Sequence, residues 1–338
     1  MDEFEFFFQK PWSDGLPVIP PTEERITAML SGTRLGASEV IGLVPPLMGE
    51  ASVEAVAAHA VMAGCEPSYL PVVLAGLRAL LAPKLNLNGV QGTMHSAAPL
   101  IIVNGPYSKK IGLHGGTGCI GPGFRANATI GRTIRLILMN LGGGVPVSAS
   151  MSTFGSPARY TFCFAENEAE SPWEPLSVAR GFQQNDDVVT AVMTEAPQGY
   201  IDDYSKEPES FFVGLADKIS TLGSLNIWLR TQVVVALGPD HARMCADAGL
   251  EKKDVHRRIM ELARRPLGEL RKSGYWREEM AAKWPFDVDL QDDSFLVPAI
   301  KNEDDLILIV AGGTPGPVTA VMPGWVDGSE AVSTGYQP

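Results

Sequence analysis

The chain has 338 residues, of which 45% are hydrophobic and 20% charged, and a formal net charge of −12. This length and composition suit a globular protein with a sizeable core, built as one large domain or two smaller ones. The acidic balance excludes nucleic acid as a main partner, because phosphate binding needs clustered Lys and Arg. The start of the chain, residues 1–5, is acidic where a signal peptide is basic, so we expect a cytoplasmic protein that does not bind membranes.

The first half of the chain predicts a proline-rich segment, two helices and a strand. The segment over residues 1–50 is expected to pack on the body, with Thr22 capping a short helix. Apolar residues recur at helical spacing over residues 52–64 and 68–82. The continuous apolar run at residues 100–103 is typical of a buried strand.

Helices and strands alternate along the remaining chain. Helices are expected near residues 126–141, 211–222, 239–248 and 253–264, and strands near 159–165, 187–194, 232–237 and 306–310. This order predicts an α/β fold with mixed sheets flanked by helices. Two subdomains are expected, an α/β region over residues 51–200 and a second one over 201–338.

The stretch from Leu113 to Arg132 is the most informative one. A glycine-dense loop holds one cysteine, Cys119, and runs into a helix. Glycines let backbone amides turn toward a ligand, and a helix start adds unpaired N–H groups and partial positive charge. We therefore predict a site for a small polar or anionic substrate in this loop. Its expected binding residues are Gly116, Gly118, Gly121, Arg125, Asn127 and Arg132.

Cys119 is the candidate nucleophile of this site. A helix start, an arginine or a protonated histidine lowers the pKa of a thiol, and His114 lies in the same loop. Glu166 and Glu168 follow a predicted strand and are candidates for proton transfer, with Asn167 and His95 as further substrate contacts. Together they predict a thiol-dependent lyase or hydrolase without a cofactor. The alternative, that Cys119 is a small residue filling a tight turn, stays open.

A metal-dependent enzyme is a second possibility. The four cysteines show no CxxC or zinc-finger spacing, and without an export signal we expect free thiols. Cys65, Cys119 and Cys163 are dispersed, as in hydro-lyases of the aconitase type, and could together bind an iron–sulfur cluster or a soft metal. Core packing of Cys65 and Cys163 is the simpler interpretation.

Several motifs taken together resemble a known bacterial family. They are Trp12–Thr22, Ala63–Pro67, Gly118–Arg132, Ala165–Glu168 and Gly238–Arg243. The chain resembles a poorly characterised bacterial family associated with UGSC-motif (seleno)proteins. This resemblance implies a separate thiol or selenol protein as partner, in which case the chain could be a non-catalytic larger subunit. The chain itself has no UGSC-type motif. From the abundant apolar helices we also expect a homo-oligomer.

Overall fold

The computed structural model describes residues 3–338, with side chains described from residue 5. The chain forms two compact units. Unit 1 comprises Met1–Ala169, Pro175–Ala196 and Ser329–Pro338, and unit 2 comprises Glu170–Glu174 and Pro197–Gly328. The expected mixed α/β fold is confirmed: each unit contains a mixed sheet packed with helices.

Unit 1 carries the candidate site. Its helices are α1 (Glu3–Phe8), α2 (Glu23–Leu30), α3 (Val53–Ala63), α4 (Leu70–Leu81), α5 (Leu87–Gly92), α6 (Pro106–Lys110), α7 (Arg125–Asn140) and α8 (Leu176–Ala179), with short 3-10 turns at Pro67–Tyr69, Pro83–Leu85 and Pro157–Arg159. Its strands are β1 (Val40–Val44), β2 (Gly49–Ser52), β3 (Ala98–Asn104), β4 (Cys163–Ala165), β5 (Val188–Thr194) and β12 (Val332–Gly335).

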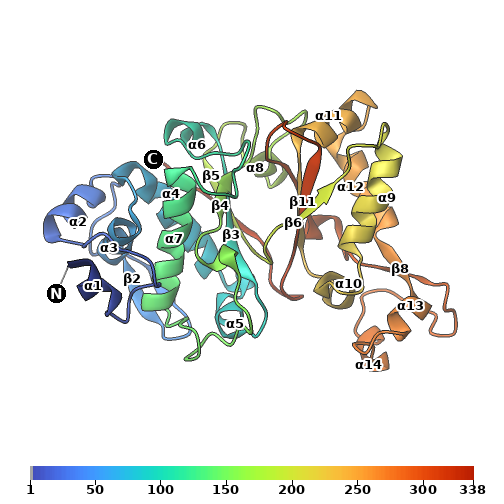
Figure 1. Cartoon of the computed structure of the whole chain (residues 1–338), viewed down its shortest axis with the longest axis horizontal. Helices are drawn as coiled ribbons and strands as arrows, with labels where there is room; N and C mark the ends of the chain where they lie inside the picture. The colour runs from blue at the N-terminus through green and yellow to red at the C-terminus, as the bar shows by residue number, and fades with distance from the viewer. Residues whose placement is uncertain (1–2) are drawn as a thin grey trace. The chain divides into compact units, whose positions relative to one another are not determined.

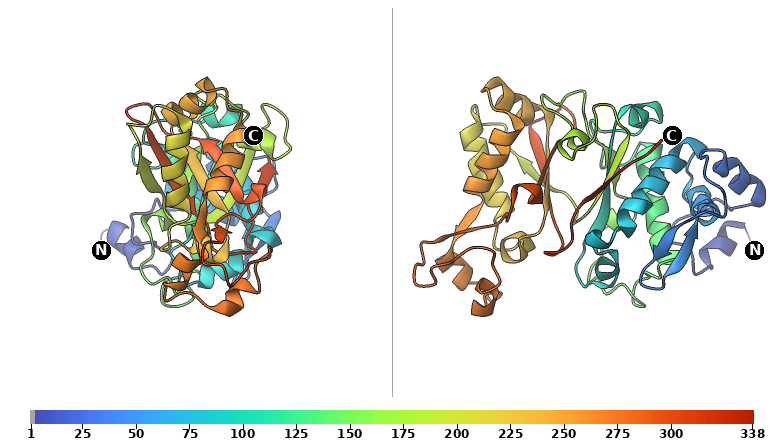
Figure 2. Two further views of the ribbon diagram at one scale, coloured as in Figure 1. Left: turned by 90° about the vertical axis from the view of Figure 1, so that its right-hand side faces the viewer. Right: turned by 180° about the vertical axis from the view of Figure 1, so that it is seen from behind.

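The main sheet of unit 1 has the strand order β12-β5-β3-β4. Strand β3 runs parallel to β4 and antiparallel to β5, and β12 runs antiparallel to β5. Every residue of β3 and β5 is buried, as their unbroken apolar sequences require. Helix α4 contacts β5 and β12, α7 contacts β4, and α3 packs on α7. These helices lie on one side of the sheet (Figures 1 and 2).

Unit 2 has its own four-stranded sheet. The helices are α9 (Pro208–Ile219), α10 (Leu225–Leu229), α11 (Pro239–Asp247), α12 (Lys252–Leu262), α13 (Leu267–Arg271) and α14 (Glu278–Ala281), with a 3-10 turn at Glu303–Asp305. The strands are β6 (Gln198–Ile201), β7 (Val233–Leu237), β8 (Arg264–Pro266), β9 (Leu296–Pro298), β10 (Leu306–Val310) and β11 (Val318–Pro323). The sheet order is β10-β7-β11-β6, and β8 pairs with β9.

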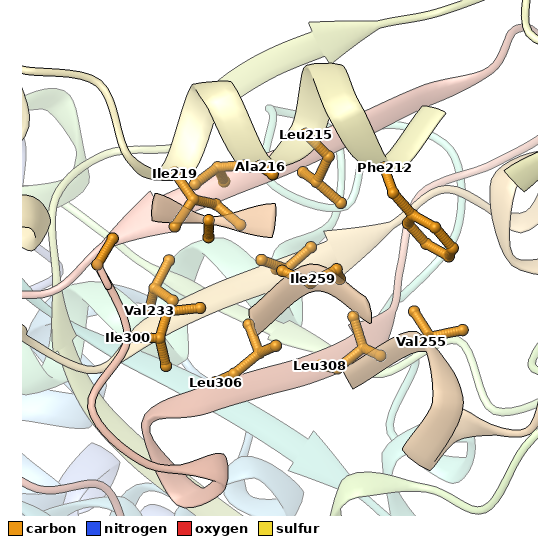
Figure 3. Close-up of a cluster of buried hydrophobic side chains, with 14 of the residues drawn as sticks. Phe212, Leu215, Ala216, Ile219, Val233, Val255, Ile259, Ile300, Leu306 and Leu308 are labelled. Carbon is orange, nitrogen blue, oxygen red and sulfur yellow. The ribbon is translucent and has the colours of Figure 1, made fainter. Parts of the chain in front are cut away.

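The core of unit 2 forms where α9 and α12 meet the sheet. In Figure 3, Leu215 and Ile219 of α9 and Ile259 of α12 point toward Val233 and Leu306 of strands β7 and β10. All of these side chains are buried. Burial of apolar area on this scale stabilises the unit independently of any ligand.

The structure corrects three details of the sequence prediction. The strand expected at residues 159–165 begins only at Cys163, because Pro157–Arg159 forms a 3-10 turn. The C-terminal strand β12 was not predicted, and through it residues 329–338 return to unit 1. The division between units falls after Ala196, whereas the sequence placed a region boundary at residue 200.

No single helix of the described chain is long and apolar enough to cross a membrane. One bent pair of consecutive helices, Pro67–Leu81 and Pro83–Gly92, passes that test by length and composition alone. The first of these contains α4, which is largely buried in unit 1.

Candidate functional site

Polar side chains gather at one edge of the unit 1 sheet. Asn104 is the last residue of β3, Glu166 directly follows β4, and Asp187 directly precedes β5. Because β3 and β4 are parallel and β5 is antiparallel to β3, these three positions lie at the same edge. This edge lies outside the carboxyl ends of the parallel strands, where ligands bind in open α/β sheets.

Asn104 fixes the two predicted glutamates. Its amide nitrogen Nδ2 donates to Glu166 Oε2 at 2.6 Å and to Glu168 Oε1 at 3.0 Å. Glu168 Oε1 also accepts from the backbone nitrogen of Gly105 at 2.8 Å, and Glu166 Oε2 from that of Leu176 at 2.8 Å. Asn104 is fully buried and Glu166 is 5% exposed, so both carboxylates are held in place by hydrogen bonds.

Asp187 lies on the other side of Gly105. Its Oδ1 accepts a hydrogen bond from the backbone nitrogen of Tyr107 at 2.8 Å. Gly105 has a φ of 98°, and a Cβ at this position would meet Asp187 Oδ1 at 2.6 Å. Burial raises the pKa of Asp187, and the nearby charge of Glu168 raises it further. A carboxyl group with a raised pKa is a candidate for a functional group.

A cavity of about 560 Å³ opens beside Asp187, and we call it the carboxyl-edge cavity. Its lining residues are Thr33, Arg34, Leu35, Pro71, Leu74, Arg78, Phe182, Asp186, Asp187, Gly335, Tyr336 and Gln337. Arg78 lies 3.6 Å from Glu39, whereas no described carboxylate pairs with Arg34. The hydroxyl of Tyr336 is buried without a hydrogen-bond partner among the described residues, and burial together with the charge of Asp187 raises its pKa.

The backbone of the glycine loop is hydrogen-bonded within the loop and to the side chain of Asn127. Cys119 is 4% exposed, and its backbone nitrogen donates to Gly116 O at 3.0 Å. The amide of Asn127 donates to Cys119 O at 3.0 Å and to His114 O at 2.8 Å, and its oxygen accepts from His114 N at 2.9 Å. The backbone nitrogen of Gly121 donates to Gly118 O at 2.8 Å. Asn127 therefore holds the loop together, a role that the sequence did not suggest.

His114 is engaged within the same loop. Its ring stacks on Phe124 with centroids 3.8 Å apart, and its Nε2 lies 3.1 Å from Thr117 O. A Cβ at Gly115 would meet the carbonyl of Ala165 and lie 3.0 Å from Asn167 N. The loop thus packs directly against the end of β4, and the structure brings it next to Glu166 and Asn167 as the sequence reasoning required.

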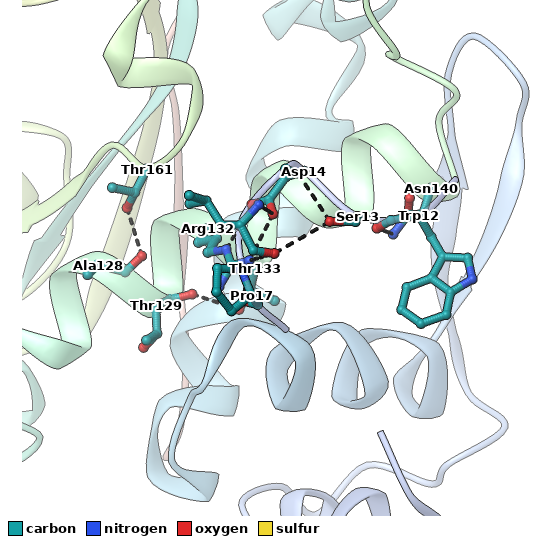
Figure 4. A network of polar contacts seen from close by, with 12 residues as sticks. Trp12, Ser13, Asp14, Pro17, Ala128, Thr129, Arg132, Thr133, Asn140 and Thr161 are labelled. Atoms are coloured by element: carbon teal, nitrogen blue, oxygen red, sulfur yellow. Dashed lines mark hydrogen bonds and ion pairs between the residues drawn. The ribbon is translucent and has the colours of Figure 1, made fainter. Parts of the chain in front are cut away.

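The two arginines of α7 do not point into this loop. Arg125 binds Glu66 Oε1 at 2.6 Å and Gly64 O at 3.0 Å. Arg132 forms two 2.8 Å bonds to the carboxylate of Asp14, and Figure 4 shows this network. The prediction that these guanidiniums hold an anion at the loop is therefore not supported. Their shared helix face binds the N-terminal segment and the loop after α3 instead.

His95 and Cys65 bond to groups outside the glycine loop. His95 Nε2 lies 2.8 Å from Glu195 Oε1, and Cys65 Sγ lies 3.2 Å from Thr133 Oγ1. Burial raises the pKa of both Cys65 and Cys163. Within the part of the chain that the structure describes, no three His, Cys, Asp or Glu residues form a group that could hold a metal ion. The predicted metal set of Cys65, Cys119 and Cys163 is therefore not assembled.

No protein-family model matches this chain, and no curated protein matches its sequence. The resemblance to the family associated with UGSC-motif proteins therefore stays a prediction.

Sequence reasoning missed Asp187, Arg34 and Tyr336. The apolar pattern indicates only that Asp187 begins a strand. A signal was present, because two adjacent acidic residues, Asp186 and Asp187, open an otherwise apolar strand. Arg34 and Tyr336 come from opposite ends of the chain, and nothing local marks either of them.

Proposed function

We propose that unit 1 is an enzyme of the lyase or hydrolase type that transfers a proton to or from a small anionic substrate in the carboxyl-edge cavity. One observation carries this proposal. Asp187, whose pKa burial raises, lines a cavity of about 560 Å³ that also presents Arg34, a guanidinium with no described carboxylate partner. A cavity of this size suits a small molecule, since such sites occupy about 300–1,000 Å³.

Asp187 is the proton-transfer group of this proposal. A general acid or base works best when its pKa lies near the working pH, and a carboxyl group needs a raised pKa to reach that range. The charge of Glu168, on the other side of Gly105, contributes to the raised pKa of Asp187. Asn104 Nδ2 holds Glu168 by a hydrogen bond of 3.0 Å to its Oε1. Glu168 is thus a positioning residue, which acts on Asp187 through its charge.

Arg34 and Arg78 define the substrate class. A guanidinium binds carboxylate and phosphate groups with paired, charge-assisted hydrogen bonds. Both arginines line the cavity, and Arg78 reaches Glu39 only at 3.6 Å, with its side chain 41% exposed. An exposed ion pair of this length is weak, so Arg78 can exchange Glu39 for a substrate anion.

Exchange of hydrogen for deuterium tests this proposal across a whole class of candidate substrates. A panel of small hydroxy- and keto-carboxylates is incubated with the protein in D₂O and followed by proton NMR. The wild type is expected to label or convert at least one member, and Asp187→Asn to lose about 100-fold or more of that rate, the usual contribution of a general acid or base. Asp247→Asn, an exposed residue of unit 2, is the matched control.

Retention of the full rate in a folded Asp187→Asn variant would contradict the assignment of Asp187. Loss of binding in Arg34→Gln, with the fold intact by circular dichroism, is expected if the substrate is anionic. Equal loss in Asp247→Asn would show that the effects are not specific to the cavity.

A further inference from the structure

Unit 1 contains a second, separate cavity of about 650 Å³. It lies between the start of the chain, the last turns of α7 and the loop over residues 146–160, and we call it the arginine cavity. None of its lining residues lines the carboxyl-edge cavity. The residues that matter here are Arg135, Arg159, Ser152, Phe154 and Tyr160.

Two guanidiniums in this cavity lack a neutralising carboxylate. Across residues 5–338, no ion pair involves Arg135 or Arg159. Burial and the positive charge of Arg159 together lower the pKa of Arg135 to about 10, while the charge of Asp14 acts in the opposite direction. Asp14, the acidic residue of the lining, is bound through both oxygens by Arg132 at 2.8 Å. The arginine cavity therefore holds an excess of positive charge.

Both guanidiniums are held in place by neutral groups. Arg159 donates to Ala97 O at 3.1 Å, to His95 O at 3.1 Å and to Ser150 Oγ at 2.8 Å. Arg135 Nη2 donates to Gly144 O at 2.8 Å, and no described residue accepts from its Nε or Nη1. Carbonyl oxygens orient the guanidiniums without cancelling their charge, and such preorganisation lowers the cost of binding an anion.

The rim of the cavity is apolar and exposed. Phe154 is 95% exposed and Tyr160 is 50% exposed, although both are large hydrophobic side chains. Met139 and Pro157 add further apolar surface, and Ser152 supplies a hydroxyl. A site with a few fixed polar groups and apolar walls is typical of small organic ligands.

We propose that the arginine cavity binds a small organic anion with a carboxylate on an aromatic body. Arg135 and Arg159 bind the carboxylate, because guanidinium forks match its two oxygens. Phe154 and Tyr160 cover the aromatic ring, which removes apolar surface of all three from water. This site is distinct from the proposed enzymatic one, so the two proposals can fail independently.

Isothermal titration calorimetry with benzoate and its neutral analogue benzamide tests the charge requirement directly. We expect saturable binding of benzoate to the wild type, and binding of benzamide weaker by about tenfold or more, as loss of a charge-assisted hydrogen bond implies. Equal affinities for benzoate and benzamide, or no saturable binding of benzoate, would overturn the proposal.

Variants locate the site. Arg135→Gln is expected to weaken benzoate binding by about tenfold or more, whereas Arg264→Gln, an exposed arginine of β8, is expected to leave it unchanged. Because Arg135 is buried, Phe154→Ala serves as a second variant that leaves the fold intact, and it is expected to weaken benzoate binding about threefold or more through lost apolar contact. Unchanged binding in a folded Arg135→Gln or in Phe154→Ala would contradict the location.

Discussion

Single residues at the edge of the unit 1 sheet carry the functional argument. Asp187 and Glu168 approach Gly105 from two sides, and the absence of a side chain at Gly105 makes this approach possible. The negative charge of Glu168 favours the protonated form of Asp187. Sequence reasoning found Glu168 because it follows a strand. It could not find Asp187, since the register between β3 and β5 decides which residues lie next to each other.

The raised pKa of Asp187 predicts a stability effect. A carboxyl group whose folded-state pKa is raised stabilises the fold below its unfolded pKa of about 3.9 and loses that contribution as the pH rises through the folded value. At pH 7 the ionised Asp187 therefore disfavours folding. Asp187→Asn is expected to raise Tm at pH 7 and to leave it nearly unchanged at pH 3, as measured by calorimetry. A lower Tm at pH 7 would show that the ionised carboxylate is stabilising.

Gly115 provides a residue-scale test of the loop packing. A Cβ here would meet the carbonyl of Ala165, so Gly115→Ala is expected to lower the free energy of unfolding by about 1–3 kcal/mol. Gly36 has no atom within 4 Å of a built Cβ, so Gly36→Ala is the matched control and should change little. Equal effects in urea denaturation would contradict the close approach of the glycine loop to β4.

The cysteines give a second residue-scale prediction. Burial raises the pKa of Cys65 and Cys163, and that of Cys245 to about 12, so these groups stay protonated at pH 8. We expect them to resist iodoacetamide in the native protein, as measured by mass spectrometry. Labelling of Cys119 under the same conditions would favour a thiol-dependent reaction. Rapid labelling of the other three would contradict their burial.

At the scale of elements, α7 was well predicted but its charged partners were not. Helical spacing indicated its buried positions, and Ile130, Ile134 and Ile137 are indeed buried. Spacing also placed Arg125 and Arg132 on one face, but it carries no information on what packs there. The partner of Arg132, Asp14, is distant in sequence and was identified only from the structure.

The Arg132–Asp14 pair is expected to hold the proline-rich segment on the body of unit 1. Asp14 is 3% exposed in its side chain, so Arg132→Ala leaves a buried carboxylate unpaired and is expected to cost about 3 kcal/mol in the free energy of unfolding. The double variant Asp14→Asn with Arg132→Ala should recover part of this loss. If the single and double variants unfold at the same denaturant concentration, the pair does not have this role.

For the whole molecule, the alternation of helices and strands predicted the α/β class. Continuous apolar runs in the sequence located β3, β5, β7 and β10. The return of β12 to unit 1 could not be predicted, because a four-residue strand lacks a periodic signal. The candidate site differs from the predicted one for a related reason. Glycine density indicates a loop that can bind a ligand, but here the side chain of Asn127 bonds to the loop backbone and Ala165 packs against Gly115.

Acid sensitivity is a property of the whole molecule, and His256 of unit 2 is one source of it. Burial and the positive charge of Lys252 together lower the pKa of His256 to about 4. A histidine with a depressed pKa stabilises the fold above about pH 6.5, and this contribution is lost as the pH falls toward 4. Between pH 6.5 and 4.5 the free energy of unfolding is expected to fall by about 1–2 kcal/mol less in His256→Gln than in the wild type. An unchanged pH profile in urea titrations would contradict it.

The central claim is that Asp187 is an acid–base group held ready in the carboxyl-edge cavity, and its titration tests this claim most directly because no substrate is needed. Carbon-13 NMR of the aspartate carboxyls, with Asp187 assigned by its loss in Asp187→Asn, gives its pKa in the native protein. We predict a value above the usual one of about 3.9 and a decrease in Glu168→Gln, since the charge of Glu168 contributes to the shift. A pKa at or below the usual value, unchanged by Glu168→Gln, would contradict the account.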